Sequence, residues 1–269
     1  MSMPRLFFYG KIYLRYFGQY FKGRLAYRAD ILIQMVFALS TQITSLIFIL
    51  IIFNHIPDIN GWRYGEILFI YGFAQTSIAL FSMFFSNLIQ LGRFYILDGN
   101  FDRVLLRPLP PLFQIIIERL DIGSFSTLAM GVGALFYAAA KLNMSLSTFE
   151  CLIFFGLVLS ATLIFTGLVL ILVSLTFWIK DPTGALAWPL MTVREFAKYP
   201  ITIYSPALQV FLSWILPLAF TSFYPATLFL GRQDYVLHVY LTPVIALLTW
   251  GIGTLVWNLG VRRYESSGS

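Results

Sequence analysis

Long uninterrupted apolar segments are the feature that most constrains how this chain can fold. They lie at residues 31–53, 67–91, 113–140, 149–179 and 241–259. Each approaches or exceeds the roughly 20 residues that an α-helix needs to cross the hydrocarbon core of a bilayer. A helix satisfies all of its own backbone hydrogen bonds in that solvent. The sequence therefore predicts an all-α polytopic membrane protein.

The composition excludes two alternative classes. The 269 residues are 59% hydrophobic and only 11% charged, against a charged share of about 25% in soluble domains. A membrane β-barrel would show alternating segments of about 10 residues instead of these continuous runs. Cys151 is the single cysteine, so an internal disulfide or a multi-cysteine zinc site is excluded as well.

The basic residues indicate which ends of the spans face the cytoplasm. Three connections carry few of them, namely Arg63, Lys141 and Arg232. Most of the others gather before the first run, between the second and third, and after the last, at Arg5, Lys11, Arg15, Lys22, Arg24, Arg28, Arg93, Arg103, Arg107, Arg119, Arg262 and Arg263. By the positive-inside rule this predicts six spans with both termini in the cytoplasm. Orientation explains the net charge of +6, and no nucleic-acid partner is expected.

The remaining span has two possible positions. In one topology residues 206–230 cross the membrane, and the basic stretch 183–204 stays in the cytoplasm. In the other, residues 183–198 cross outward as a fifth span, and 205–230 form a re-entrant helix pair in the outer leaflet. Proline removes a backbone donor, so the pair would be broken at Pro217 and Pro225. The residues alone leave this choice open.

The first 30 residues have a pattern of their own. Tyrosines at helical spacing, with basic residues on another face, predict an amphipathic helix at the inner membrane surface; these are Tyr9, Tyr13, Tyr16 and Tyr20. A docking surface for a cytosolic partner is compatible with that role. The expected organisation is a cytoplasmic segment 1–30, one transmembrane domain 31–260, and a cytoplasmic tail 261–269.

Ion-coupled transport and catalysis both require residues that this sequence lacks. Ion-coupled carriers place ionisable groups near the midplane, yet the centres of 31–53, 67–91 and 241–259 carry no charge. The phosphate-loop, H-E-x-x-H and G-x-S-x-G motifs are missing. His55 and His238 fall in predicted outer connections, so we expect no metal site and no cofactor bound by this chain.

Two further sets of residues are interpreted as architecture. The charged residues in the first turns of the third span can pair or snorkel to the interface, with a role at the inner mouth of a substrate path as the alternative; these are Glu118, Arg119 and Asp121. Small residues four apart are typical of close helix packing, and they occur at Ala129 with Gly133 and at Gly156 with Ser160.

The predicted cytoplasmic connection after the second run suggests how such a protein is driven. Phe101, Leu105 and Leu109 are four apart beside Asp102 and Arg103, which predicts a short amphipathic helix. Pro108 and Pro110 would end it. A membrane body without its own coupling site is passive, structural or driven by a separate subunit. This helix could pass force from a cytosolic motor, the alternative being a solvated turn.

A series of short motifs runs along the chain. The D-G-x-x-D-x-x-L-x-R-P run occupies residues 98–108. The others, in order, are Gly61-Trp62 with Glu66, Phe177-Trp178, Tyr199-Pro200, Ile203-Tyr204, Pro217 with Phe220, Pro225-Ala226, Leu230-Gly231 and Arg262-Arg263-Tyr264. Each is weak alone. Their order from end to end resembles the permease subunits of type-2 ABC transporters, specifically bacterial exporter permeases of this length.

The resemblance implies a permease that is not itself catalytic and resides in the bacterial inner membrane. It implies a second permease, homologous or identical, and two cytosolic ATP-binding subunits that carry the ATP and Mg. The expected contacts to those subunits are Asp98, Gly99, Asp102, Arg103, Leu105, Arg107 and Pro108. It favours the second topology, and we expect an outer gate at Pro200, Pro217 and Pro225. The alternative function is a membrane protein not driven by ATP, either a lipid scaffold or an intramembrane enzyme.

Overall fold

The computed structural model describes residues 28–179 and 185–265, together with residues 10–13, 15, 18, 19, 22 and 23. Most of segment 1–30 lies outside these residues, including Tyr9, Tyr16 and Tyr20, so its amphipathic helix stays a prediction. Within the described residues the chain forms helices and no strand, apart from an isolated bridge between Ile59 and Trp62. The expectation of an all-α fold is confirmed.

Four helices in the described part are long and apolar enough to cross a membrane. They are α2 (Arg28–His55), α3 (Tyr64–Phe85), α7 (Thr148–Ser174) and α11 (Val236–Arg263). Helix α3 continues without interruption through η1 (Ser86–Gln90) and η2 (Leu91–Leu97), and η3 (Leu175–Phe177) extends α7. These helices correspond to four of the predicted apolar runs.

The third predicted run is not one helix. It divides into α5 (Pro111–Glu118) and α6 (Ser124–Lys141), with Arg119 extended at φ −138° and ψ 137°. The expectation of a continuous helix over 113–140 is therefore wrong. The Asp121 carboxylate accepts hydrogen bonds from Gly123 N at 3.0 Å and Ser124 Oγ at 2.6 Å, and Arg119 lies over the Phe94 ring. The charged residues stabilise a turn because each finds a separate partner there.

The segment before α11 is made of short helices. The first stretch is helical from 185 to 198, and Tyr199 in extended conformation ends it. A turn at Pro217 separates two later stretches, whereas Pro225 lies inside α10, so the predicted break at Pro225 is wrong. The elements are η4 (Ala185–Ala187), α8 (Trp188–Val193), η5 (Arg194–Lys198), η6 (Ile201–Ile203), α9 (Pro206–Val210), η7 (Phe211–Ile215), η8 (Leu218–Thr221), α10 (Phe223–Phe229) and η9 (Gln233–Tyr235).

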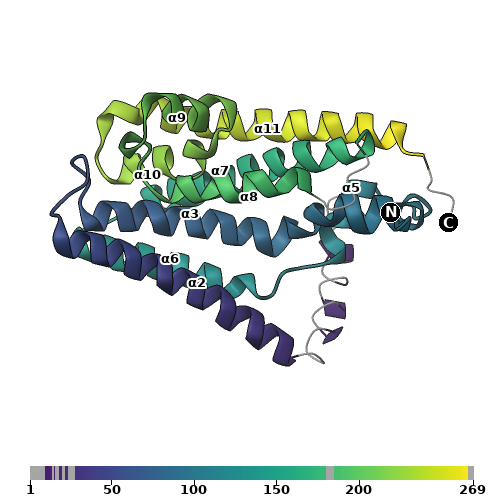
Figure 1. Ribbon diagram of the computed structural model, residues 1–269, viewed down its shortest axis with the longest axis horizontal. Helices are drawn as coiled ribbons and strands as arrows, with labels where there is room; N and C mark the ends of the chain where they lie inside the picture. Colours follow the sequence, from purple (N-terminus) through teal and green to yellow (C-terminus); the bar gives the residue numbers. More distant parts are fainter. Residues whose placement is uncertain are drawn as a thin grey trace.

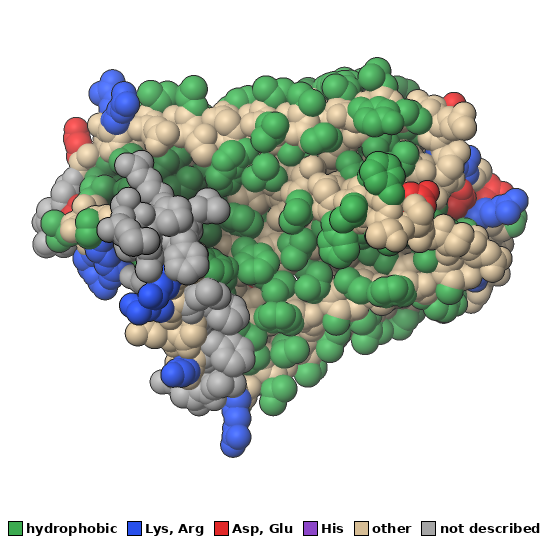
Figure 2. Space-filling view, turned by 180° about the vertical axis from the view of Figure 1, so that it is seen from behind, with side chains coloured by type: hydrophobic (Ala, Val, Ile, Leu, Met, Phe, Trp, Pro, Cys, Tyr) green, Lys and Arg blue, Asp and Glu red, His purple; other side chains and the backbone are tan. Residues whose placement is uncertain are grey.

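The long helices run side by side along the longest dimension of the molecule (Figure 1). Helices α9 and α10 lie at one end and α5 at the opposite end, while α2 diverges from the others. Burial follows this arrangement: 83% of the most apolar window of α3 is buried inside the protein, against 6% of that of α2. The face in Figure 2 is mostly hydrophobic, with charged side chains gathered toward the two ends. Such a surface suits a bilayer.

Two pairs of helices make their closest contact at glycines. A Cβ at Gly167 of α7 would lie 2.6 Å from the carbonyl carbon of Thr249 in α11, and one at Gly72 of α3 would lie 2.9 Å from the Gly131 oxygen in α6. A Cβ at Gly133 or Gly156 would meet no atom within 4 Å. The predicted close packing at these last two glycines is therefore wrong, because they face away from the neighbouring helices.

Candidate functional site

The predicted coupling loop forms a turn followed by a short helix, α4 (Asn100–Leu105). Gly99 precedes the helix with a φ of +71°, a left-handed conformation that favours glycine. Asp98 N donates to Arg93 O at 3.1 Å, and Asn100 Nδ2 donates to Phe94 O at 2.9 Å. The Asp-Gly pair of the 98–108 motif thus turns the chain from η2 into α4.

Phe101 attaches α4 to the ends of two long helices. It is fully buried, and its ring centroid lies 4.7 Å from that of Tyr264, 5.4 Å from Phe177 and 6.1 Å from Trp257. We call these four residues the aromatic seat. A Cβ at Gly260 would lie 2.3 Å from the Phe177 ring, so only glycine leaves room for that ring. Motifs far apart in the sequence therefore meet in one cluster.

The exposed face of α4 differs from the predicted one. Val104 is buried with Phe101, whereas Leu105 is 44% exposed and Leu106 is 86% exposed. The predicted buried stripe does not include Leu105: Phe101 lies inside the protein, whereas Leu105, the last residue of α4, is exposed. Asp98 is also exposed. We call the remaining exposed set the inner platform; it consists of Arg103, Leu105, Leu106, Arg107 and Pro108.

Asp102 faces the aromatic seat. It is half-buried, and burial together with its carboxylate raises the pKa of Tyr264 to about 12. Among the expected contacts to the ATP-binding subunits, Asp102 therefore lies beside the protein's own C-terminal motif. Leu106 is the residue that the motif did not point to, although an exposed large apolar side chain outside the bilayer is the more informative feature.

The other end of the molecule joins a second group of motifs. Trp62 Nε1 donates to Thr202 Oγ1 at 2.7 Å, and Arg232 lies 4.6 Å from the Trp62 ring centroid. Arg232 also pairs with Glu66 at 2.9 Å. Of the predicted gate residues, Pro200 follows Tyr199, Pro217 lies in the turn between η7 and η8, and Pro225 lies in α10. Their role as a gate stays a prediction.

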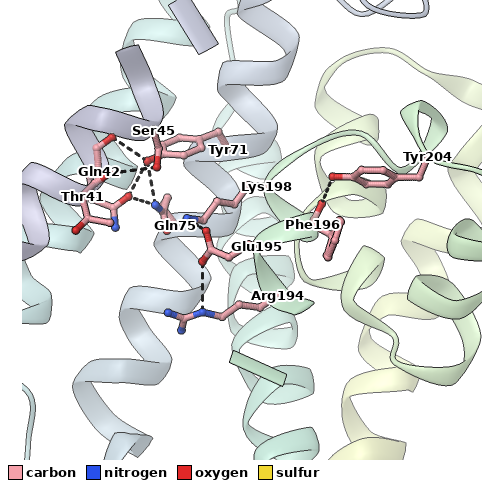
Figure 3. A network of polar contacts seen from close by, with 10 residues as sticks. All are labelled: Thr41, Gln42, Ser45, Tyr71, Gln75, Arg194, Glu195, Phe196, Lys198 and Tyr204. Carbon is pink, nitrogen blue, oxygen red and sulfur yellow. Dashed lines mark hydrogen bonds and ion pairs between the residues drawn. The ribbon is translucent and has the colours of Figure 1, made fainter. Parts of the chain in front are cut away.

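A network of polar side chains lies between these two ends, where α2, α3 and η5 meet (Figure 3). Tyr71 and Gln75 of α3 both bind the side-chain oxygen of Gln42 in α2, the tyrosine hydroxyl at 2.6 Å. In η5, Glu195 pairs with Lys198 at 2.5 Å and lies 3.7 Å from Arg194 Nε. Lys198 is buried, with its ammonium 5.9 Å from the Tyr71 ring centroid.

The depth of this network follows from the helices that it touches. At 1.5 Å per residue, Tyr71 lies about 10 Å along α3 from Tyr64, and Gln75 about 16 Å. The guanidinium of Arg194 lies 6.0 Å from the Phe165 ring, and that ring packs against Phe81. Phe81 lies about 25 Å along α3 from Tyr64. A hydrocarbon core is about 30 Å thick. The charged side chains of η5 therefore lie beside the middle of α3, although the centres of 31–53, 67–91 and 241–259 themselves carry no charge.

A helical body with membrane-spanning helices, an exposed patch of apolar and basic residues at one end and a charged network among its helices is the architecture expected of a membrane transport subunit. Consistent with this, the sequence pattern of the ABC-2 family transporter proteins matches residues 39–268. The chain belongs to that family, and it is a membrane protein with a permease-like transport role. The family implies association with ATP-binding subunits in general. No curated protein and no solved structure matches the chain.

Proposed function

We propose that this chain is the permease subunit of an ATP-driven exporter. Two separate cytosolic ATP-binding subunits would supply the ATP and Mg chemistry, and a second permease, homologous or identical, would complete the substrate path. This chain would take no catalytic step itself. Movement of the two permeases relative to each other would then expose the path to one side of the membrane at a time.

The inner platform is the observation that carries this proposal. Leu105 and Leu106 present apolar surface between Arg103 and Arg107, at the end of the molecule that the proposed topology places in the cytoplasm. An apolar patch rimmed by charge is typical of a protein contact. The aromatic seat ties this platform to the ends of α7 and α11, so a push on α4 would reach both helices.

We further infer six membrane crossings, with both termini in the cytoplasm of a bacterial cell. The crossings would be α2, α3, α5 with α6, α7, the stretch 185–198 and α11. Residues 206–229 would form the outer-leaflet helix pair. The hydrogen bond between Thr202 and Trp62 supports this topology, because it holds the end of the fifth crossing beside the start of α3.

Site-specific photo-crosslinking in cells tests the platform. A photoreactive amino acid at Leu106 should form a covalent product with an ATP-binding subunit, identified by peptides of its phosphate loop. The matched control is Ile56, which is 41% exposed in a connection at the opposite end. A product from Leu106 with none from Ile56 is expected. Equal products from both positions, or none from Leu106 while the two subunits copurify, would overturn the assignment of the platform.

A further inference from the structure

The charged residues of η5 carry an excess of positive charge. Glu195 is the only carboxylate that pairs with Arg194 and Lys198 in the described part of the chain. One carboxylate against two cations leaves a formal charge of +1 at mid-depth. Tyr71, Gln75 and Gln42 are neutral and occupy one another's hydrogen bonds. An unbalanced charge in the hydrocarbon region is costly and is commonly functional.

Arg194 has free donor capacity at this site. Its Nε is buried and makes no hydrogen bond within the described residues, and the nearest carboxylate oxygen is 3.7 Å away. The side chain as a whole is 26% exposed, so the residue is not sealed from a ligand. A guanidinium offers a planar fork of donors that matches the oxygens of a phosphate or a carboxylate.

A second identical copy cannot balance this charge. In the described part of the chain every other acidic residue lies near a helix end or in a connection: Asp30, Asp58, Glu66, Asp98, Asp102, Glu118, Asp121, Glu150, Asp234 and Glu265. Each copy would bring its own Arg194, Glu195 and Lys198, and with them the same charge of +1. Among the described residues no second carboxylate balances the charge, so we look for the anion on another molecule.

The surroundings of the cluster indicate what kind of molecule carries that anion. On the same helical stretch Trp188 is 65% exposed and Phe196 is 38% exposed. Helix α2, which contributes Gln42, presents exposed apolar residues such as Phe37 and Ile43. Phe196 lies on the other side of η5 from the cations, next to Tyr204 (Figure 3). A ligand that reaches the cations from the lipid therefore passes the apolar surface of α2. It therefore needs an apolar body as well as an acidic group.

We propose that Arg194 and Lys198, with Glu195 as their internal counter-ion, bind the phosphate or carboxylate headgroup of an amphiphile at mid-depth in the membrane. This inference rests on the proposed transport function, since it names the class of substrate that the permease moves. Glu195 then competes with the ligand for the cations, and a bound headgroup takes its place beside Arg194.

Direct binding to the purified full-length chain in a neutral detergent tests this site. The probes are dodecyl phosphate and dodecanoate, with dodecyltrimethylammonium as the cationic comparison and inorganic phosphate as a competitor. Arg194→Gln should raise the dissociation constant for the acidic amphiphile about tenfold or more, as expected for the loss of a charged hydrogen bond. Arg262→Gln, at an exposed arginine outside the bilayer, is the matched control and should change it less than twofold.

The direction in which Glu195→Gln changes the dissociation constant distinguishes a binding site from a structural ion network. Glu195→Gln should lower the dissociation constant, because it removes the competing carboxylate, even though it leaves both cations unbalanced. Arg194→Lys keeps the charge without the fork and should fall between wild type and Arg194→Gln, which keeps the test usable if the glutamine variant does not fold. The relative affinities of dodecyl phosphate and dodecanoate assign the headgroup.

Three results would overturn the site. The first is an equal loss of affinity in Arg262→Gln and Arg194→Gln. The second is an unchanged affinity in Glu195→Gln together with an unchanged affinity in the Arg194 variants. The third is displacement of the amphiphile by inorganic phosphate at equal concentration. The measurement uses no ATP-binding subunit. Its failure would leave the crosslink from Leu106 untouched, and a missing crosslink would leave the binding result untouched.

Discussion

The contact between α7 and α11 can be tested at a single glycine. In Gly167→Ala the new Cβ would lie 2.6 Å from the carbonyl carbon of Thr249, 2.8 Å from its oxygen and 2.8 Å from Trp250 N. All three are backbone atoms, so no side chain can rotate away. Carbon atoms are at their optimum at about 3.5–4.0 Å, so the two helices must separate by about 1 Å.

The matched control is Gly156→Ala on the same helix, where a Cβ meets no atom within 4 Å. Alanine is favoured over glycine in a helix by about 1 kcal/mol, and this gain is shared by both variants. The difference between them therefore isolates the steric cost, which is about 1–3 kcal/mol for overpacking of a tight contact.

Equilibrium unfolding of the purified variants in mixed micelles, followed by circular dichroism, measures this difference. Gly167→Ala should be less stable than Gly156→Ala by that amount. Because α7 and α11 also carry Phe177, Trp257 and Tyr264, their separation should weaken the crosslink from Leu106. If the two alanine variants unfold at the same denaturant fraction, the backbone contact between these helices is refuted.

Three further outcomes are expected. Phe101→Ala should lower the free energy of unfolding by about 3–5 kcal/mol, as for other buried phenylalanines, and should uncouple ATP hydrolysis from transport. Leu105→Ala should leave the free energy of unfolding unchanged. An equal free energy of unfolding in the two variants would contradict the aromatic seat. Asp102→Asn should lower the pKa of Tyr264 from about 12 toward the ordinary value of about 10, read by NMR of tyrosine labelled at Cζ with Tyr264→Phe for assignment. The raised pKa means that this tyrosine stabilises the fold fully below about pH 10 and that the contribution is lost as the pH rises through about 12; an unchanged pKa in Asp102→Asn would refute the contact. In a Cys151→Ser background, an impermeant maleimide should label cysteines at Ser205 and Gln233 in intact cells, and labelling of Ser205 only after permeabilisation would reject the re-entrant helix pair.

The long helices could be predicted because their signal is local. A continuous apolar run of sufficient length specifies a membrane helix without reference to the rest of the chain, and α2, α3, α7 and α11 follow that rule. The turn between α5 and α6 could not be predicted in the same way. It depends on partners in another segment: Phe94 for Arg119, the Tyr95 hydroxyl for Glu118, and the Met83 carbonyl for Asp121.

The glycines show a related limit. Small residues at i, i+4 mark a face on which helices can approach closely, but the spacing does not say which face meets a neighbour. Gly133 and Gly156 satisfy the spacing and face away from neighbouring helices, while Gly72 and Gly167 lie at backbone contacts. The motifs of the 98–108 loop likewise mark a segment without its faces, and only the structure separates buried Phe101 and half-buried Asp102 from the exposed Leu106.

The charged network at η5 is the part of the candidate site that the sequence concealed most, and its surroundings explain why it matters for movement. Arg194, Glu195 and Lys198 make the stretch 183–204 resemble a cytoplasmic connection, and the spacing of Tyr71 and Gln75 on α3, opposite Gln42, was the signal that could have revealed it. Helices α7 and α11 meet at their backbones, and α3 and α6 do so at Gly72 and Gly131, so separating either pair disrupts many tightly packed atoms. Helix α2 is largely exposed. It packs mainly on α6 and reaches α3 through the hydrogen bonds of Gln42, which water or a polar headgroup can replace. A displacement of α2 relative to α3 would therefore disrupt fewer packed atoms than separation of either glycine pair, and it would break the hydrogen bonds of Gln42 with Tyr71 and Gln75.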